Sequence, residues 1–150
     1  MSDSASFVPD DFVVPRSLVT DTFRLEPLGP EHNEGDYAAW TSSIDHIRST
    51  PGMQGRSWPR PMTPDENLSD LEGHARDFAN RTGFTYTVRD IDTDEIVGCV
   101  YIYPWKNEPG TRILSWVRAS RADLDLPVYE AVSEWLQTAW PFASVTYAPR

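Results

Sequence analysis

ILSWVRASRADLDLPVYEAVSEWLQTAW, residues 113–140, joins an apolar run to a long amphipathic segment through a short basic turn. The run Thr111–Val117 predicts a strand, and the apolar spacing that begins at Val128 predicts a helix. The turn between them carries Arg118 and Arg121. A strand, a basic turn and a helix N-terminus often hold a pyrophosphate in proteins, because the first N–H groups of a helix lack internal partners.

Two features of the same turn oppose anion binding. Asp123 and Asp125 place negative charge beside the arginines, and no glycine occurs after Gly110. Arg118 and Arg121 therefore have two interpretations. They hold a phosphate bidentately, or they pair with the neighbouring acids Asp123, Asp125 and Glu130. The aspartates have an ordinary alternative role as caps of the helix.

The bulk composition limits the function classes. A chain of 150 residues is sufficient for one domain with a substantial core. Its formal charge of −10 argues against a nucleic-acid partner, since phosphate neutralisation needs a basic face. No segment is long and apolar enough to span a membrane, and the first residues lack the pattern of a secretory signal. The single cysteine, Cys99, favours a cytoplasmic location.

The remaining pattern predicts an α+β (or α/β) domain over residues 21–150, preceded by an N-terminal arm over residues 1–20. Apolar residues in the arm indicate that it is partly pinned to the domain. Thr63, Pro64 and Glu66 form a capping box that predicts the start of a helix. The predicted order is β-α-α-β-β-β-α-β. Strands are expected at 22–28, 84–90, 96–103, 111–117 and 143–148. Helices are expected at 32–43, from the cap at Thr63 through Phe78, and from the segment 125–127 to a stop at Pro141.

A ligand pocket is predicted beside the loop 49–62, which is rich in glycine and proline. Loops of this length in compact domains are often functional. Two sets of residues are candidates to line the pocket. The loop interleaves arginine with tryptophan, and the central strand alternates tyrosine with aliphatic residues. The alternative is a loop anchored by a buried tryptophan and ordinary packing between strands. The candidates are Arg56, Trp58, Arg60, Tyr101 and Tyr103.

No metal site is expected. Asp90, Asp92 and Asp94 alternate as in a calcium loop, but the glycine and glutamate of that motif are missing, so a solvated turn is the better interpretation. The histidines lack the spacing of metal ligands. Cys99 lies in the most apolar strand, which indicates an inert core thiol.

These elements and residues resemble the GNAT superfamily of N-acetyltransferases. The carrying segments are FRLEPLGPEHNEGDYAAW at 23–40, FTYTVRDIDTDEIVGCVYIYP at 84–104 and SWVRASR at 115–121. The resemblance covers residues 22–148 in order and spacing. It implies a central, mostly antiparallel mixed sheet with helices on both faces.

The resemblance also implies acetyl-CoA as cofactor. Pantetheine would lie in an opening between the strands 111–117 and 143–148, and the pyrophosphate would lie on the turn and the start of the last helix. The cofactor-binding residues implied in this way are Trp116, Val117, Arg118, Arg121, Ala122 and Leu124.

Three departures from the family pattern are visible. Leu124 or Leu126, depending on register, stands where the first glycine of the family's loop belongs. The stretch Thr111–Ser115, where many members of the family carry a carboxylate as general base, offers Arg112 and no acid. The chain stops at Arg150, which leaves Tyr147 as the nearest candidate for a catalytic acid.

Two functions follow as hypotheses. The first is an acyl-CoA-dependent N-acyltransferase that acylates an amine of a small molecule or protein. The alternative is a catalytically silent module of the same fold that binds a ligand or a protein partner; fold alone does not choose between them. If the strand 143–148 is an exposed edge, pairing with a second copy would cover it, so a homodimer is also predicted.

Overall fold

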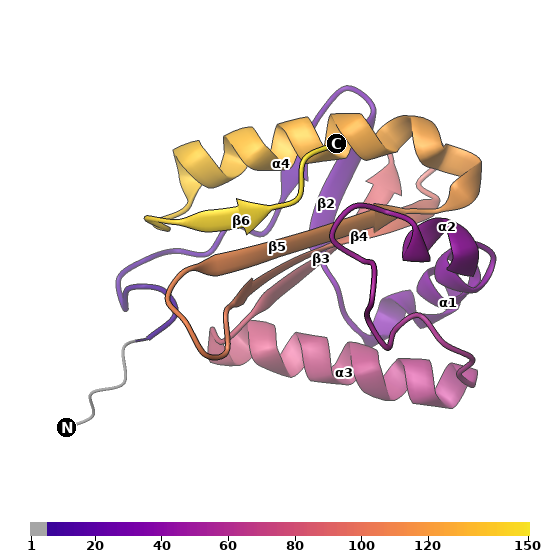
Figure 1. Ribbon diagram of the computed structural model, residues 1–150, viewed down its shortest axis with the longest axis horizontal. Helices are drawn as coiled ribbons and strands as arrows, with labels where there is room; N and C mark the ends of the chain where they lie inside the picture. The colour runs from indigo at the N-terminus through magenta and orange to yellow at the C-terminus, as the bar shows by residue number, and fades with distance from the viewer. Residues whose placement is uncertain (1–5) are drawn as a thin grey trace.

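The computed structural model describes residues 6–150 and has one curled six-stranded sheet (Figure 1). The strands lie in chain order, antiparallel from β1 to β5, and β6 runs parallel to β5. The predicted mixed sheet and element order are confirmed. The strands are β1 Leu18–Val19, β2 Phe23–Pro27, β3 Phe84–Asp90, β4 Ile96–Pro104, β5 Thr111–Val117 and β6 Val145–Tyr147.

Helices cover both faces of the sheet (Figure 1). The four α-helices are α1 Asn33–Thr41, α2 Ile44–Arg48, α3 Pro64–Asn80 and α4 Asp125–Ala139, and short 3-10 turns, η1 Pro30–His32 and η2 Ala119–Leu124, precede α1 and α4. The predicted helix at 32–43 is interrupted: α1 ends at Thr41 and α2 begins at Ile44. Each face has its own core, one under α4 and one under α1 to α3.

Helix α3 begins as its sequence predicts. The Thr63 hydroxyl accepts a hydrogen bond from the Glu66 backbone N–H at 3.1 Å, and the Glu66 carboxylate accepts one from the Thr63 N–H at 2.8 Å. Pro64 occupies the first position, where a missing N–H costs nothing. This start fixes the helix that forms one wall of the cavity described below.

Replacing Thr63 with alanine is expected to lower the free energy of unfolding by about 1 kcal/mol, because one cap acceptor is lost. Urea denaturation measures the change. Thr63→Ser is the matched control, since it keeps the hydroxyl and should cost less than half as much. An equal cost for both variants would show that the methyl group of Thr63, rather than its cap, stabilises the helix.

The N-terminal arm lies against the domain over its described residues. Val8 is only 1% exposed and belongs to the α4-side core, while Val13 is exposed. Tyr86 donates to the Pro15 carbonyl at 2.7 Å. The sequence indicated no strand here, yet β1 pairs with β2, because the outer backbone groups of β2 are available to it.

The other edge of the sheet is β6. Val145 is 42% exposed there, and no strand pairs with the outer side of β6 in residues 6–150. This edge is the one on which the predicted homodimer depends; dimerisation stays a prediction. Within the described residues, no helix is long and apolar enough to cross a membrane.

Candidate functional site

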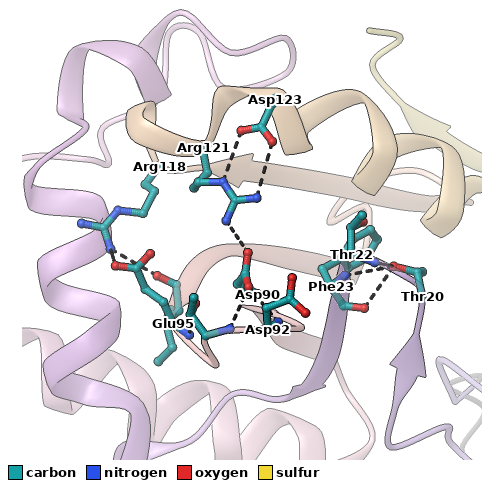
Figure 2. Close-up of polar contacts among 11 residues, drawn as sticks. Thr20, Thr22, Phe23, Asp90, Asp92, Glu95, Arg118, Arg121 and Asp123 are labelled. Atoms are coloured by element: carbon teal, nitrogen blue, oxygen red, sulfur yellow. Dashed lines mark hydrogen bonds and ion pairs between the residues drawn. The ribbon is translucent and has the colours of Figure 1, made fainter.

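The arginines of the basic turn after β5 bind acids at the end of β3 and in the β3–β4 turn (Figure 2). Arg118 donates from Nη1 to Glu95 Oε2 at 3.4 Å and to the Ile96 carbonyl at 3.3 Å. Arg121 donates to Asp90, and its Nε donates to Asp123 Oδ1 at 3.3 Å. The sequence indicated Asp123 as one partner and missed Asp90 and Glu95.

Asp90 holds Arg121 in this orientation. Its carboxylate accepts from Arg121 and from the backbone N–H groups of Asp92 and Thr93, at 2.8 and 2.9 Å. These donors, Arg121 first, hold the pKa of Asp90 well below its ordinary value, so it stays ionised at all physiological pH values. Arg121 is therefore neutralised by the protein itself.

The other predicted cofactor residues lie in three environments. Trp116 is buried, and its indole N–H donates to the Tyr101 hydroxyl at 2.9 Å. Val117 and Leu124 are buried in the α4-side core, while Ala122 is exposed. Leu126, the alternative to Leu124 in the predicted register, is 47% exposed at the first turn of α4.

No side chain caps helix α4. Its N-cap is Leu124, which has no oxygen to offer, and Asp125 turns away to bind Arg150. The predicted capping by the aspartates is therefore wrong. The start of α4 carries the negative charge of Asp123 and Asp125, and both carboxylates pair with arginines of the chain, Asp123 with Arg121 and Asp125 with Arg150.

Strands β5 and β6 part after Ile113, and the region between them is called the groove. The two strands pair only along Thr111–Ile113, opposite Val145–Tyr147. Beyond Ile113, the edge of β5 that faces β6 meets the segment after β6 instead of another strand. The Ser115 carbonyl on this edge accepts a hydrogen bond from Arg150 Nη2 at 2.8 Å.

Arg150 fills the groove. Its side chain is only 4% exposed, and its Nε binds Asp125 Oδ2 at 2.8 Å. Nη2 also donates to Ser115 Oγ at 3.1 Å, and Nη1 donates to the carbonyls of Ala148 and Pro51 at 2.8 and 3.2 Å. All three guanidinium nitrogens are thus satisfied by β5, α4 and the loop after α2.

Tyr147 lies beside Arg150 in the groove. Its hydroxyl and Ser115 Oγ are 2.6 Å apart, and its ring centroid lies 4.7 Å from that of Tyr129. The guanidinium carbon of Arg150 lies 5.6 Å from the Tyr147 ring and 5.8 Å from the Tyr129 ring. Burial raises the pKa of Tyr147 to about 12, so its phenol is protonated at neutral pH.

A cavity of about 630 Å³ lies on the face of the sheet that α1 to α3 cover, opposite α4. Strand β4 contributes its tyrosines, and the walls come from α3, β5 and the loop between α2 and α3. This volume is ordinary for a small-molecule site. Of the five residues predicted to line a pocket, Arg56, Trp58, Tyr101 and Tyr103 line this cavity, whereas Arg60 lies outside it and donates to the Pro61 carbonyl at 3.3 Å.

Trp58 packs on the core and also faces the cavity. Its ring centroid lies 5.4 Å from that of Trp40 and 5.9 Å from that of Trp116, so it anchors the loop on the core. It also lines the cavity. The loop wall is thereby held in place by aromatic packing.

The wall formed by α3 was not predicted. Asp70, His74 and Asp77 line the cavity, and their spacing of four and three residues places them on one face of the helix. Tyr103 donates to Asp77 Oδ2 at 2.8 Å, and its oxygen lies 3.1 Å from His74 Nδ1. Burial lowers the pKa of His74, which keeps the imidazole neutral.

Asp36 of α1 also lines the cavity and was missed. It is 4% exposed, and its Oδ2 accepts from Asn67 Nδ2 at 3.1 Å. Burial raises its pKa from 3.8 to about 6. A carboxyl with a pKa near neutrality in a cavity is a candidate proton acceptor.

Asp36→Asn is expected to stabilise the protein at neutral pH. Because the folded-state pKa lies above the ordinary one, the native state binds the proton more tightly, and Asp36 lowers stability as the pH rises from about 4 to about 6. The variant should gain up to about 2–3 kcal/mol at about pH 7 and almost nothing at about pH 4. Urea denaturation at both pH values measures the difference.

The control for Asp36→Asn is Asp65→Asn, an exposed aspartate on α3. It should show no gain that depends on pH in this range. A gain for Asp36→Asn of the same size at both pH values would mean that the change acts through packing, and would contradict the assigned burial of a charge.

Solved structures with a similar fold include several acetyltransferases. The ribosomal-protein-S5-alanine acetyltransferase from Vibrio fischeri aligns with a TM-score of 0.63 at 13% identity, over 82% of this chain and 68% of that one. RimL, a ribosomal L7/L12 α-N-protein acetyltransferase solved with coenzyme A, gives 0.65 at 12% identity, over 80% and 64%. MccE, a microcin C7 self-immunity acetyltransferase solved with acetyl-CoA and AMP, gives 0.60 at 17% identity, over 79% and 62%.

The chain has the GNAT acetyltransferase fold. No protein-family model and no curated protein sequence matches it. This chain spans less than two thirds of the RimL and MccE chains. Similarity at these identities establishes the fold alone, and the activities of those proteins do not transfer with it.

The acyl-CoA expected from the GNAT resemblance does not fit the residues present. The resemblance implies pantetheine in the opening between β5 and β6, where Arg150 binds the Ser115 carbonyl. It implies the pyrophosphate on the η2 turn, where Arg121 is neutralised by Asp90 and Asp123. Both halves of the implied site are thus satisfied by the chain's own side chains.

Proposed function

We propose that this GNAT-fold protein is a catalytically silent module that binds a small molecule in the cavity on the α3 side of the sheet. The observation that carries the proposal is the buried guanidinium of Arg150 in the groove between β5 and β6. Displacing it would leave Asp125 without its cation and the Ser115 carbonyl without its donor. A ligand that enters the groove must compensate these losses, since a buried polar group without a partner is costly.

The charge of the turn supports the same proposal. An incoming pyrophosphate would meet Asp123 beside Arg121, and Arg118 already binds Glu95. Releasing Arg121 would free the Asp90 carboxylate, whose pKa is held down chiefly by that arginine. Anion binding here would therefore leave two or more carboxylates unpaired near a polyanion, which like-charge repulsion opposes.

A second candidate is the acyl-CoA-dependent N-acyltransferase, acting on an amine of a small molecule or protein. The observation in its favour is the parting of β5 and β6 after Ile113 beside a cavity that reaches Leu114. Asp36 would be the proton acceptor and Tyr147 a weak candidate for the acid. This function requires Arg150 to leave the groove before acetyl-CoA enters.

Calorimetric titration with acetyl-CoA, with CoA as control, tests the proposal on the natural chain and on Arg150→Ala. We expect no heat from either protein up to millimolar ligand. Micromolar binding to the natural chain would overturn the proposal in favour of the acyltransferase. Binding by Arg150→Ala alone would also overturn it, because the groove would then be an intact cofactor site that Arg150 closes. Arg60→Ala, an arginine outside both sites, is the matched control.

A further inference from the structure

Two arginines that line the cavity have no ion-pair partner in the described chain. Arg56 comes from the loop after α2 and Arg112 from β5, and both line the cavity. Burial, and then the charge of Arg56, lower the pKa of Arg112. Among residues 6–150 neither takes part in an ion pair. In a chain with a net charge of −10, two arginines that line one cavity without acid partners are unusual.

The guanidinium of Arg112 is held in place without being neutralised. Its central carbon lies 5.2 Å from the centroid of the Trp105 ring, a cation–π contact that leaves its N–H groups available. A planar guanidinium of this kind binds a carboxylate bidentately. The β5 side of the cavity is therefore equipped for an anion.

Acids from two helices also line the cavity, together with Arg76 of α3. Asp36 from α1 and Asp70 from α3 both line it, and the charge of Asp70 contributes to the raised pKa of Asp36. Asp36 has one hydrogen bond, from Asn67, and no cation within ion-pairing distance in the described chain. A buried carboxylate of this kind is stabilised by a proton or by a bound cation.

The fold keeps the two sets of charges apart. Helix α3 packs on β3, Arg112 lies on β5, and β4 lies between them with Tyr101 and Tyr103 lining the cavity. Neither Arg56 nor Arg112 pairs with Asp36 or Asp70, although all four line one cavity. Opposite charges that share a cavity without touching leave room for a molecule that carries both.

We propose that the cavity binds a small zwitterion, with its carboxylate on Arg56 and Arg112 and its ammonium group on the Asp36 and Asp70 side. This assignment rests on the proposed function, since it names the class of small molecule that the module takes. Trp58 and Tyr101 present aromatic surface between the two ends, which suits an aliphatic or aromatic body.

The test uses β-alanine, γ-aminobutyrate, ε-aminohexanoate and phenylalanine as probes, each with its N-acetyl and amide derivatives. Thermal shift identifies the best probe, and calorimetry measures its dissociation constant. We expect at least one free amino acid to bind in the millimolar range or tighter, and each blocked derivative to bind roughly 10-fold more weakly. Absence of binding by every probe, or equal binding of free and blocked forms, would overturn the assignment.

Variants locate the two ends of the bound probe. Arg112→Gln and Asp70→Asn should each weaken binding roughly 10-fold, because each removes one charge-assisted contact. Two control variants replace residues outside the cavity: Arg60→Gln in the loop that holds Arg56, and Asp65→Asn in α3, the helix that holds Asp70. Both should leave binding unchanged. Equal losses in the control variants would overturn the assignment, since general electrostatics would then explain the binding.

The proposed function and the proposed ligand class can be overturned by separate results. Zwitterion binding is measured without any CoA compound, and the blocked derivatives are compared on the natural chain, so a variant that folds poorly does not decide the result. Acetyl-CoA binding with no zwitterion binding would overturn both proposals. No acetyl-CoA binding and no zwitterion binding would overturn only the ligand class.

Discussion

Replacing Arg150 with alanine is expected to lower the free energy of unfolding by about 3 kcal/mol, a loss typical of a buried ion pair from which one partner is removed. The side chain is 4% exposed and Asp125 is 24% exposed, so the remaining carboxylate keeps some solvent and the cost lies at the low end of the range. The Ser115 carbonyl also loses its donor. Urea denaturation measures the change.

A double-mutant cycle with Asp125→Ala shows whether the pair itself is responsible. We expect a coupling energy of about 1–3 kcal/mol between Arg150 and Asp125. Arg24→Ala, which breaks a surface ion pair, should cost less than about 1 kcal/mol. A cost for Arg150→Ala as small as that of Arg24→Ala, with no coupling to Asp125, would show that the groove is open in solution.

Local sequence patterns were sufficient to predict most of the fold. The apolar spacing Val128, Val132, Trp135 and Leu136 matches the face that α4 buries. The capping box at Thr63 places the start of α3 correctly. The residues of such a signal lie close together in the sequence, so the signal can be recognised without knowledge of the tertiary structure. The break between α1 and α2 was missed, because nothing in the pattern around Ser42 marks it.

The opening between β5 and β6 was expected from the resemblance, but the side chains that fill it could not be predicted, because their contacts join distant parts of the chain. Arg150 binds the Pro51 carbonyl from 99 positions away and the Ser115 carbonyl from 35 positions away. Arg121 binds Asp90 across 31 positions, while the sequence suggested only its near neighbours. Ion-pair partners depend on which turns the sheet brings together. The spacing of charged residues along the chain does not show which turns these are.

The residues that line the cavity were predicted in part. Arg56, Trp58, Tyr101 and Tyr103 were predicted to face one pocket, and they line one cavity. The acidic side was missed although a signal existed, since Asp70, His74 and Asp77 recur at helical spacing on α3. Asp36 gave no such signal, because a single aspartate in a short helix is usually exposed.

Gly98→Ala is expected to lower the free energy of unfolding by about 3 kcal/mol, at the upper end of the usual cost of overpacking. Gly98 of β4 pairs with Val117 of β5. A Cβ at this position would overlap the Trp116 carbonyl oxygen and lie 3.2 Å from the Val117 Cα. These are backbone atoms of a neighbouring strand, so they cannot move aside as a flexible side chain does.

Gly73→Ala on α3 provides the control of opposite sign. The nearest atom to an added Cβ there is Arg76 Nη2 at 3.7 Å, an ordinary contact, so the gain in helix propensity should stabilise the protein by up to about 1 kcal/mol. A loss in both variants would mean that any added methyl group is harmful. A loss at Gly98 alone would show that the close approach of β4 to β5 depends on this glycine, and with it the position of Trp116, whose indole binds Tyr101 beside the cavity.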